Sequence, residues 1–327
     1  LGFNLKWNMG WMNDMCHYLK LDPWFRQDHH KDITFSMMYA FSENFVLPIS
    51  HDEVVHMKGS VVGKMPGDYT NQLRCTRGFY AYLLAHPGKK LLFMGAELGQ
   101  WHEWNDKESL DWYLLDSEEN QKVHRFFKEA NAFYKKEPAL WEIDFSWEGF
   151  EWLVVDDNHN NVVVFLRKDK KGRDLLCAVN FSPNTYEGYR MGVPAHKQYT
   201  PVFNTDAVEY GGDGFGDKEP VLVEAIESHG KEYSAAIRIP AFGAVFLRGE
   251  GTFPKPKAAK EPKAPKAVKT VEKASKAAGK TVKASAKALV KTVKSSAKAE
   301  KAPKEGKAEK PERKPRAKKQ AKELKET

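Results

Sequence analysis

The sequence is poor in cysteine and lacks any long apolar run. Its 327 residues include three cysteines, Cys16, Cys75 and Cys177, with no Cys-x-x-Cys pair and no histidine at ligand spacing nearby. This usage favours reduced, structural thiols in a cytoplasmic protein and argues against a metal or catalytic role for them. No run approaches the ~20 apolar residues needed to cross a bilayer, so we expect a soluble chain without a membrane partner.

Residues 251–327 lack aspartate and have almost no aromatic or large aliphatic side chains. They hold 25 Lys and Arg against 8 Glu, a net charge of +17, so residues 1–250 carry 27 basic and 36 acidic residues, or −9. Such a segment cannot bury enough apolar surface to offset its ordering entropy, and we predict a disordered basic tail. Its charge favours nonspecific association with nucleic acid or another polyanion; a solvated spacer without a partner is an equal alternative.

Three short apolar runs alternate with helical patterns in residues 1–137. Residues 1–7, 45–49 and 90–94 suit strands buried on both faces. Apolar side chains at helical spacing predict one helix over 71–85 and another that starts after Ser117 and ends before Pro138. Because strands that alternate with helices pair in parallel through crossovers, we predict part of an α/β barrel, with polar residues at its strand ends.

Residues 138–250 contain short strand patterns and turn formers with no helical period between them. This sequence pattern predicts an antiparallel β-sandwich. The expected fold class of the whole chain is therefore α/β plus all-β. The expected strands cover residues 152–155, 162–167, 175–181, 233–239 and 244–247.

One imidazole and two carboxylates, His51, Asp52 and Glu53, follow the apolar run 45–49 directly. In an α/β barrel this position holds catalytic groups rigidly at the mouth. By spacing alone, a catalytic role, a metal ligand and a helix cap formed by Asp52 for the segment from Glu53 all stay open.

Residues 43–56 (ENFVLPISHDEVVH) resemble the last of the four sequence regions of the α-amylase superfamily, in the form found in 1,4-α-glucan branching enzymes. The resemblance covers about residues 1–248. It implies that residues 1–137 contain about strands 6–8 of a (β/α)8 TIM barrel and residues 138–250 the all-β domain. Other segments resemble the same family in the same order: residues 2–14 (GFNLKWNMGWMND), 18–22 (YLKLD), 65–68 (MPGD), 87–95 (PGKKLLFMG), 103–105 (EWN), 109–112 (SLDW), 149–157 (GFEWLVVDD) and 178–183 (AVNFSP).

By this resemblance, Asp52 is the carboxylate that stabilises the transition state, and His51 hydrogen-bonds a substrate hydroxyl. The family cleaves an α-1,4 bond of a glucan and passes the cut segment to a 6-hydroxyl, in a retaining double displacement. That chemistry needs a nucleophile ~5–5.5 Å from an acid/base. In the family these two carboxylates precede the segment that residue 1 begins, so the chain alone is expected to be inactive. Glu97, Glu103 and Asp106 match no catalytic position.

Two alternatives remain at this stage. One is a fragment of an amylase-type hydrolase, and the other is a non-catalytic remnant that binds glucan or a polyanion. Three strands cannot close a barrel, so we also expect exposed apolar strand edges and poor solubility of the chain alone.

Aromatic side chains gather near the same strand ends, and sugar faces stack well on tryptophan. We expect most of Trp7, Trp11, Trp101 and Trp112 to pack in the core or between domains. Trp104 with Asn105 is the preferred substrate-binding pair, because it follows the third run on a polar loop. His29, His30 and His56 lack paired-ligand spacing, so solvated or hydrogen-bonded histidines, with no metal or cofactor, are expected.

Overall fold

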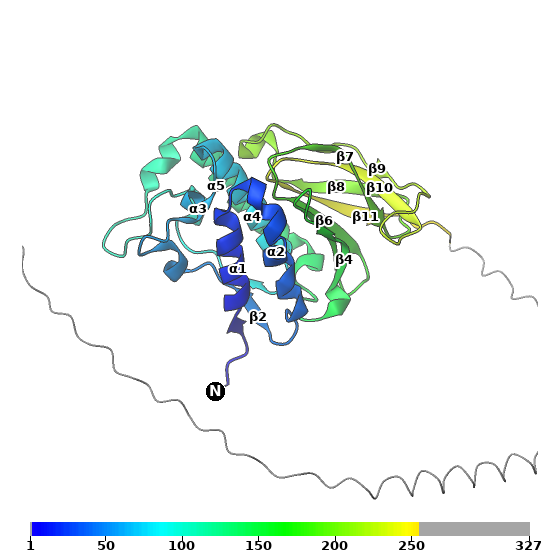
Figure 1. The fold of residues 1–327 in the computed structure, drawn as a ribbon, viewed down its shortest axis with the longest axis horizontal. Helices are drawn as coiled ribbons and strands as arrows, with labels where there is room; N and C mark the ends of the chain where they lie inside the picture. The colour runs from blue at the N-terminus through cyan, green and yellow to red at the C-terminus, as the bar shows by residue number, and fades with distance from the viewer. Residues whose placement is uncertain (1, 255–327) are drawn as a thin grey trace, which may run out of the picture. The chain divides into compact units, whose positions relative to one another are not determined.

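A three-stranded parallel sheet with helices forms the first half of the chain in the computed structural model, which describes residues 2–254 (Figure 1). Strand β2 (Phe45–Leu47) lies between β1 (Lys6–Trp7) and β3 (Lys89–Lys90) and pairs with both in parallel. Helix α1 (Met9–Lys20) follows β1, and α4 (Tyr69–Ala85) lies between β2 and β3 along the chain. The predicted strand–helix alternation with parallel pairing is therefore confirmed.

Shorter helical segments fill the connections. They are η1 (Pro23–His29), α2 (Lys31–Thr34), η2 (Phe35–Met38), η3 (His51–Val54), α3 (Val61–Lys64), η4 (Ala96–Leu98), η5 (Trp112–Asp116), η6 (Pro138–Leu140), η7 (Trp147–Gly149) and η8 (Val208–Tyr210). Helix α5 (Glu118–Lys136) begins after Ser117 and α4 spans the predicted 71–85, so both long helices were predicted correctly.

The parallel strands are shorter and less buried than their apolar runs predict. Beyond β3, Leu92 and Met94 are 37% and 52% exposed, and Trp7 on β1 is 45% exposed. Burial on both faces is thus wrong for residues 1–7 and 90–94. Leu47 shares a core with α1 and α4, whereas Trp7, which the strand register places on the face opposite Leu47, and Leu92 and Met94 belong to no core cluster of the described residues.

Residues 150–250 form two antiparallel sheets. The larger has the strand order β4 (Phe150–Asp157), β5 (Val162–Lys168), β6 (Asp174–Asn180), β11 (Ala244–Glu250), β8 (Gln198–Asn204) and β9 (Val221–Leu222). The smaller pairs β7 (Tyr186–Val193) with β10 (Tyr233–Ile239). All five predicted strands exist; four lie within these bounds, and the predicted strand 175–181 ends one residue beyond β6. Strands β7 to β9 were not predicted.

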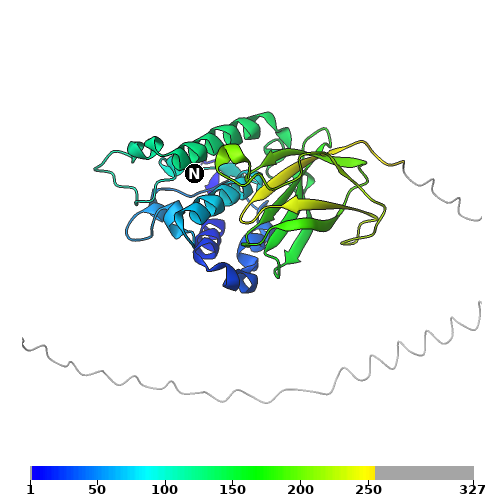
Figure 2. The ribbon, with the colours of Figure 1, turned by 90° about the horizontal axis from the view of Figure 1, so that it is seen from above.

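Both faces of the six-stranded sheet are buried, because β5 is apolar throughout residues 162–166 and β6 throughout residues 175–179. Alternate side chains of β5 and β6 point to opposite faces. One set packs with the helices: Val163, Phe165, Leu175, Cys177 and Val179. The other packs beneath β7 and β10: Val162, Val164, Leu166, Leu176 and Ala178. Seen from above, this sheet lies between the helices and the small sheet (Figure 2).

Buried polar groups attach α4 to the β-sandwich. Arg167 on β5 has no exposed surface, and its guanidinium donates to the carbonyl oxygen of Ala85 at 2.6 Å and to Asp144 at 2.9 Å. The last carbonyls of a helix lack intrahelical donors, so Arg167 satisfies the end of α4. Nearer the middle of α4, a Cβ on Gly78 would overlap the carbonyl oxygen of Phe242, so the glycine permits close packing there.

Three further sequence predictions can be placed. All three cysteines are free, and Cys75 and Cys177 are buried, as expected for structural thiols. Within residues 2–254, no helix is both long and apolar enough to cross a membrane. The predicted disordered tail lies, from residue 255 on, outside the described residues.

Candidate functional site

The candidate residues lie on the two segments that follow β2 and β3. After β2 the chain enters η3, which carries His51 and Asp52, and the segment after β3 carries Glu103, Trp104 and Asn105. Parallel strands share their carboxyl edge, so these segments start at the same edge of the sheet. They also touch, because the backbone N–H of Trp104 donates to the carbonyl oxygen of Val54 at 3.0 Å.

A capping box fixes the start of η3. The backbone N–H and the hydroxyl of Ser50 both donate to Oε2 of the buried Glu53, at 2.7 and 2.9 Å. Ser50 is therefore the N-cap residue, and the alternative in which Asp52 caps this segment is wrong. The carboxylate of Asp52 is left for another role.

Two charged side chains hold the loop after η3. The buried ammonium of Lys64 donates to the carbonyl oxygens of Glu53 and Gly59, and burial lowers its pKa to about 8. From the other segment, Glu103 accepts the N–H of Gly59 at 2.7 Å and of Met57 at 3.0 Å. These two bonds lower the pKa of Glu103. The loop is thus tied down at both ends.

Asp52 and His51 stand on the surface of this fixed loop. The Asp52 side chain is 60% exposed, and its Oδ1 lies 3.2 Å from Nζ of Lys58, which also donates to the Asp52 carbonyl oxygen. The exposed His51 ring lies beside two aromatic rings, 6.3 Å from Phe93 and 6.4 Å from Trp104 between centroids. With this exposed fraction, the Asp52 carboxylate is not enclosed by residues 2–254.

Trp104 lies beside His51, whereas Asn105 makes a hydrogen bond only within its own turn. Trp104 is half-buried and packs edge-to-face on Phe93 at 5.2 Å. The cavity beneath it has a volume of about 20 Å³, room for about one water and not for a sugar. Asn105 is exposed, and its Oδ1 accepts the N–H of Lys107 within the turn.

The other tryptophans differ from expectation. Trp11 alone among Trp7, Trp11, Trp101 and Trp112 is fully buried, and the other three are about half exposed. The expectation that most pack in the core is wrong, because Trp7 lies on the open face of the sheet and the other two lie on the long segment after β3. The hydrogen-bonded reading is confirmed for His30, whose Nε2 lies 2.9 Å from the Val155 carbonyl oxygen.

Comparisons with known proteins find similarity to one family profile and to several curated enzymes. The family profile of the alpha amylase C-terminal all-beta domain matches residues 152–250. The 1,4-alpha-glucan branching enzyme of Aquifex aeolicus is 49% identical over 252 residues, which are 77% of this chain and 40% of that enzyme. The branching enzyme of Thermosynechococcus vestitus is 48% identical over 76% of this chain and 32% of its own length. The chain is related to the 1,4-α-glucan branching enzymes.

One solved structure has a similar fold. The native Nostoc punctiforme debranching enzyme superposes with a TM-score of 0.51 at 14% identity, over 75% of this chain and 48% of that one. The chain therefore spans a third to two fifths of the curated relatives and about half of this structural one.

Sequence reasoning missed the residues that hold the candidate site in place. Ser50 and Glu53 carry the Ser-x-x-Glu signal of a capping box, which was available in the sequence. Glu103 and Lys64 had no such signal, because their partners are backbone groups of a loop whose path only the fold defines.

Proposed function

We propose that residues 1–250 are the carboxy-terminal part of a cytoplasmic 1,4-α-glucan branching enzyme. Residues 1–137 supply about strands 6–8 of its (β/α)8 barrel, and residues 138–250 its all-β domain. Identities of 48–49% to enzymes of that name support the family assignment. The parallel sheet of β1, β2 and β3 supports the barrel. The α-glucan substrate follows from the same relatives.

The observation that carries the proposal is the position of Asp52. It follows the central parallel strand on a loop that Glu53, Lys64 and Glu103 hold in place. Because the backbone that carries Asp52 is held in place, the carboxylate needs little reorganisation to accept hydrogen bonds from sugar hydroxyls. Those bonds strengthen as the ring becomes oxocarbenium-like. His51 donates to a neighbouring hydroxyl, and Trp104 and Asn105 contact the glucan beyond it.

The high exposure of Asp52 fits a site completed by other residues. The relatives are at least 2.5 times longer than the matched segment, which leaves ample chain for the nucleophile, the acid/base and the facing wall of the cleft. In a retaining mechanism the nucleophile holds the cut glucan, and the acid/base activates the acceptor 6-hydroxyl. Asp52 stabilises the transition state of both steps.

A chimera tests the proposal. Residues 1–250 replace the matching part of the Aquifex aeolicus branching enzyme, and iodine-complex absorbance is followed together with reducing ends. We expect the iodine signal to fall without new reducing ends, and Asp52→Asn to reduce this rate about 10²- to 10³-fold. Asp106→Asn, an exposed carboxylate on the other segment, is the matched control and should retain the rate.

Other outcomes of the same assay decide against the proposal. Reducing ends that rise in step with the iodine loss would indicate an amylase-type hydrolase. A folded chimera in which Asp52→Asn and Asp106→Asn behave alike would remove Asp52 from the chemistry. The 327-residue chain alone should give no iodine change.

A further inference from the structure

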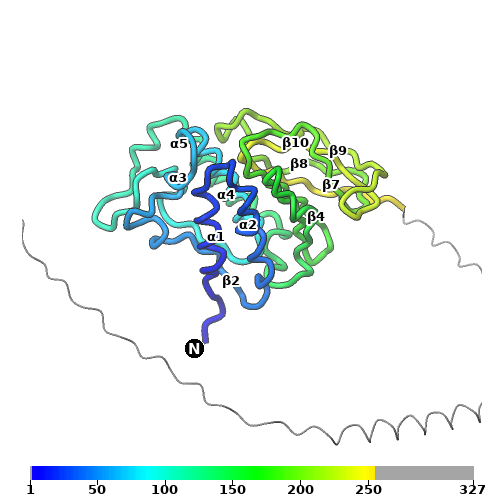
Figure 3. Tube along the Cα trace, viewed as in Figure 1, coloured from blue at the N-terminus to red at the C-terminus, as the bar shows by residue number. Residues whose placement is uncertain are grey.

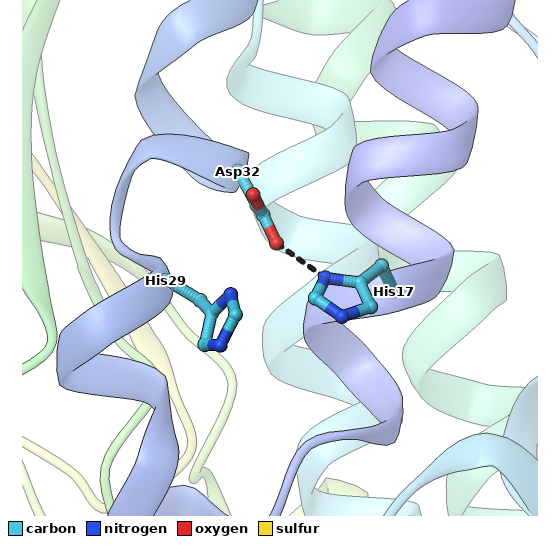
Figure 4. Close-up of side chains that lie close together, drawn as sticks. All are labelled: His17, His29 and Asp32. Carbon is cyan, nitrogen blue, oxygen red and sulfur yellow. Dashed lines mark hydrogen bonds and ion pairs between the residues drawn. The ribbon is translucent and has the colours of Figure 1, made fainter.

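Two imidazoles and a carboxylate converge beside α1. His17 on α1, His29 at the end of η1 and Asp32 on α2 point toward one another (Figure 4). One potential ligand atom of each lies within 4.8 Å of the other two. Nδ1 of His17 is 2.7 Å from Oδ2 of Asp32, and the two histidine rings lie 5.0 Å apart between centroids. The proposed glucan chemistry uses none of them.

We propose that His17, His29 and Asp32 form a binding site for a divalent transition-metal ion of the Zn²⁺ type. Two imidazole nitrogens and one carboxylate oxygen are a ligand set that Zn²⁺ accepts, with water in the fourth position, whereas Mg²⁺ and Ca²⁺ prefer oxygen alone. Ligand atoms ~2.1 Å from a tetrahedral ion are about 3.4 Å apart. The three ligand atoms already lie within 4.8 Å of one another, so the proposal requires only side-chain rotations to reach that spacing.

The backbone around the site is held in place, so only side chains must move. Buried Arg26 on η1 donates to the carbonyl oxygen of Leu19 on α1 at 3.2 Å and to that of Phe181 at 2.7 Å. This fixes η1 against α1, and Ile33 buries α2 against the same core. The traces of α1 and α2 lie side by side (Figure 3). Ligands on packed elements bind a metal with less reorganisation than ligands on free loops.

The ligand side chains themselves are accessible. The His17 side chain is 54% exposed and that of Asp32 is 21% exposed, which leaves a route for the ion and its water. Asp14, one helical turn before His17, adds a second negative charge to this face of α1. A bound cation would therefore join η1 and α2 to α1 and balance these carboxylates.

A simple ion pair between His17 and Asp32 is the competing explanation, and the chain supplies a matched control for it. His102 and Asp111 form a pair of the same kind at 2.9 Å, also with an exposed imidazole. No second histidine joins that pair within residues 2–254. If a histidine–aspartate pair were sufficient, the His17–Asp32 and His102–Asp111 pairs would bind Zn²⁺ equally well. The proposal instead requires His29 as the third ligand.

The test titrates the chelator-treated 327-residue chain with ZnCl₂ by calorimetry. We expect one strong site, weakened at least about tenfold in His29→Ala, His17→Ala and Asp32→Asn, and unchanged in His102→Ala. Residues 251–327 contain no histidine or cysteine, so they add no soft ligand. Zn²⁺ should also raise the thermal midpoint of the parent chain and not that of His29→Ala.

A spectroscopic measurement with Co²⁺ separates loss of metal binding from loss of folding. CoCl₂ should give visible ligand-field absorption in the parent and His102→Ala chains and lose it in His29→Gln, while far-ultraviolet circular dichroism stays the same. Equal Zn²⁺ affinity in His29→Ala and the parent, or an equal loss in His102→Ala, overturns the proposal. In that case the three residues form a surface ion pair with a neighbouring imidazole.

Discussion

Individual residues near β2 fall into two groups by what their polar atoms contact. Glu53, Lys64 and Glu103 bind backbone groups of the loop after β2. Asp52 and His51, carried by that loop, direct their side chains to the surface. Exposed acid and imidazole groups on a rigid loop are expected at a ligand-binding site. Groups that are already fixed lose little conformational entropy when a ligand binds.

Replacing Glu103 tests this support directly. Glu103→Gln removes one carboxylate oxygen and its charge, so the N–H groups of Met57 and Gly59 lose charge-assisted bonds. We expect these two amides to exchange hydrogen about tenfold faster, measured by residue-resolved hydrogen exchange. Glu108→Gln, on the same exposed segment, is the control. Unchanged exchange at both amides would show that the loop is held without Glu103.

His196 makes stability depend on pH. Its Nε2 lies 2.9 Å from Asp174, and this hydrogen bond raises the pKa of His196 despite partial burial. A raised pKa in the folded state contributes stability that is full below pH 6.5 and is lost as the pH rises through the folded value. We expect the difference in free energy of unfolding between the parent and His196→Gln to shrink above pH 6.5. His159→Gln, an exposed histidine, should leave the pH profile of the parent unchanged.

At the scale of secondary structure, the sequence predicts elements whose apolar pattern is regular and misses those whose pattern is interrupted. Strands β5 and β6 and helices α4 and α5 have continuous or periodic apolar side chains. Strand β8 contains Pro201, which lies opposite Leu247 where the register with β11 shifts, a position that tolerates proline. Strand β7 contains Gly188 and Gly192, which weaken the strand signal.

The same limit applies to the candidate site. Local patterns place His51 and Asp52 after a strand, and a resemblance gives them roles. The supports Glu103 and Lys64, and the approach of His17 to His29, depend on which loops and helices lie together. That information is in the packing and not in the spacing of residues along the chain.

The contact between α4 and β5 carries a prediction at the same scale. Arg167→Met leaves the carbonyl oxygen of Ala85 and one oxygen of Asp144 without their buried donor. Breaking a buried pair on one side costs about 3–5 kcal/mol, and we expect that loss in urea unfolding at neutral pH. Arg125→Met, whose partner Glu129 is 41% exposed, should change the unfolding midpoint little. A small effect of Arg167→Met would mean that water replaces the guanidinium.

The described part of the molecule has two hydrophobic cores, and the six-stranded sheet contributes to both. The six-stranded sheet faces the helices on one side and the two-stranded sheet on the other, and its central strands contribute side chains to both. Separating the helical part from the β-sandwich would expose one complete face of that sheet. We infer that residues 2–254 unfold as a single cooperative unit, because neither hydrophobic core is complete without the shared six-stranded sheet.

The parallel sheet leaves four apolar side chains outside both hydrophobic cores of the described residues. Leu5 and Trp7, at β1, and Leu92 and Met94, beyond β3, are between 37% and 52% exposed. An apolar face of this kind promotes association. We expect the 327-residue chain to self-associate in sedimentation velocity and to bind a hydrophobic dye. The double variant Leu5→Thr with Leu92→Thr should reduce both.

Leu222→Thr is the matched control, since Leu222 is 70% exposed on β9, away from this sheet. The chimera with the Aquifex aeolicus enzyme supplies a second comparison. If β1, β2 and β3 are barrel strands, the remaining strands cover their open face, so the dye should bind the chimera far less than the chain. A monomeric chain that binds no dye, or a Leu222→Thr effect equal to that of the double variant, would show that this face is not what drives association.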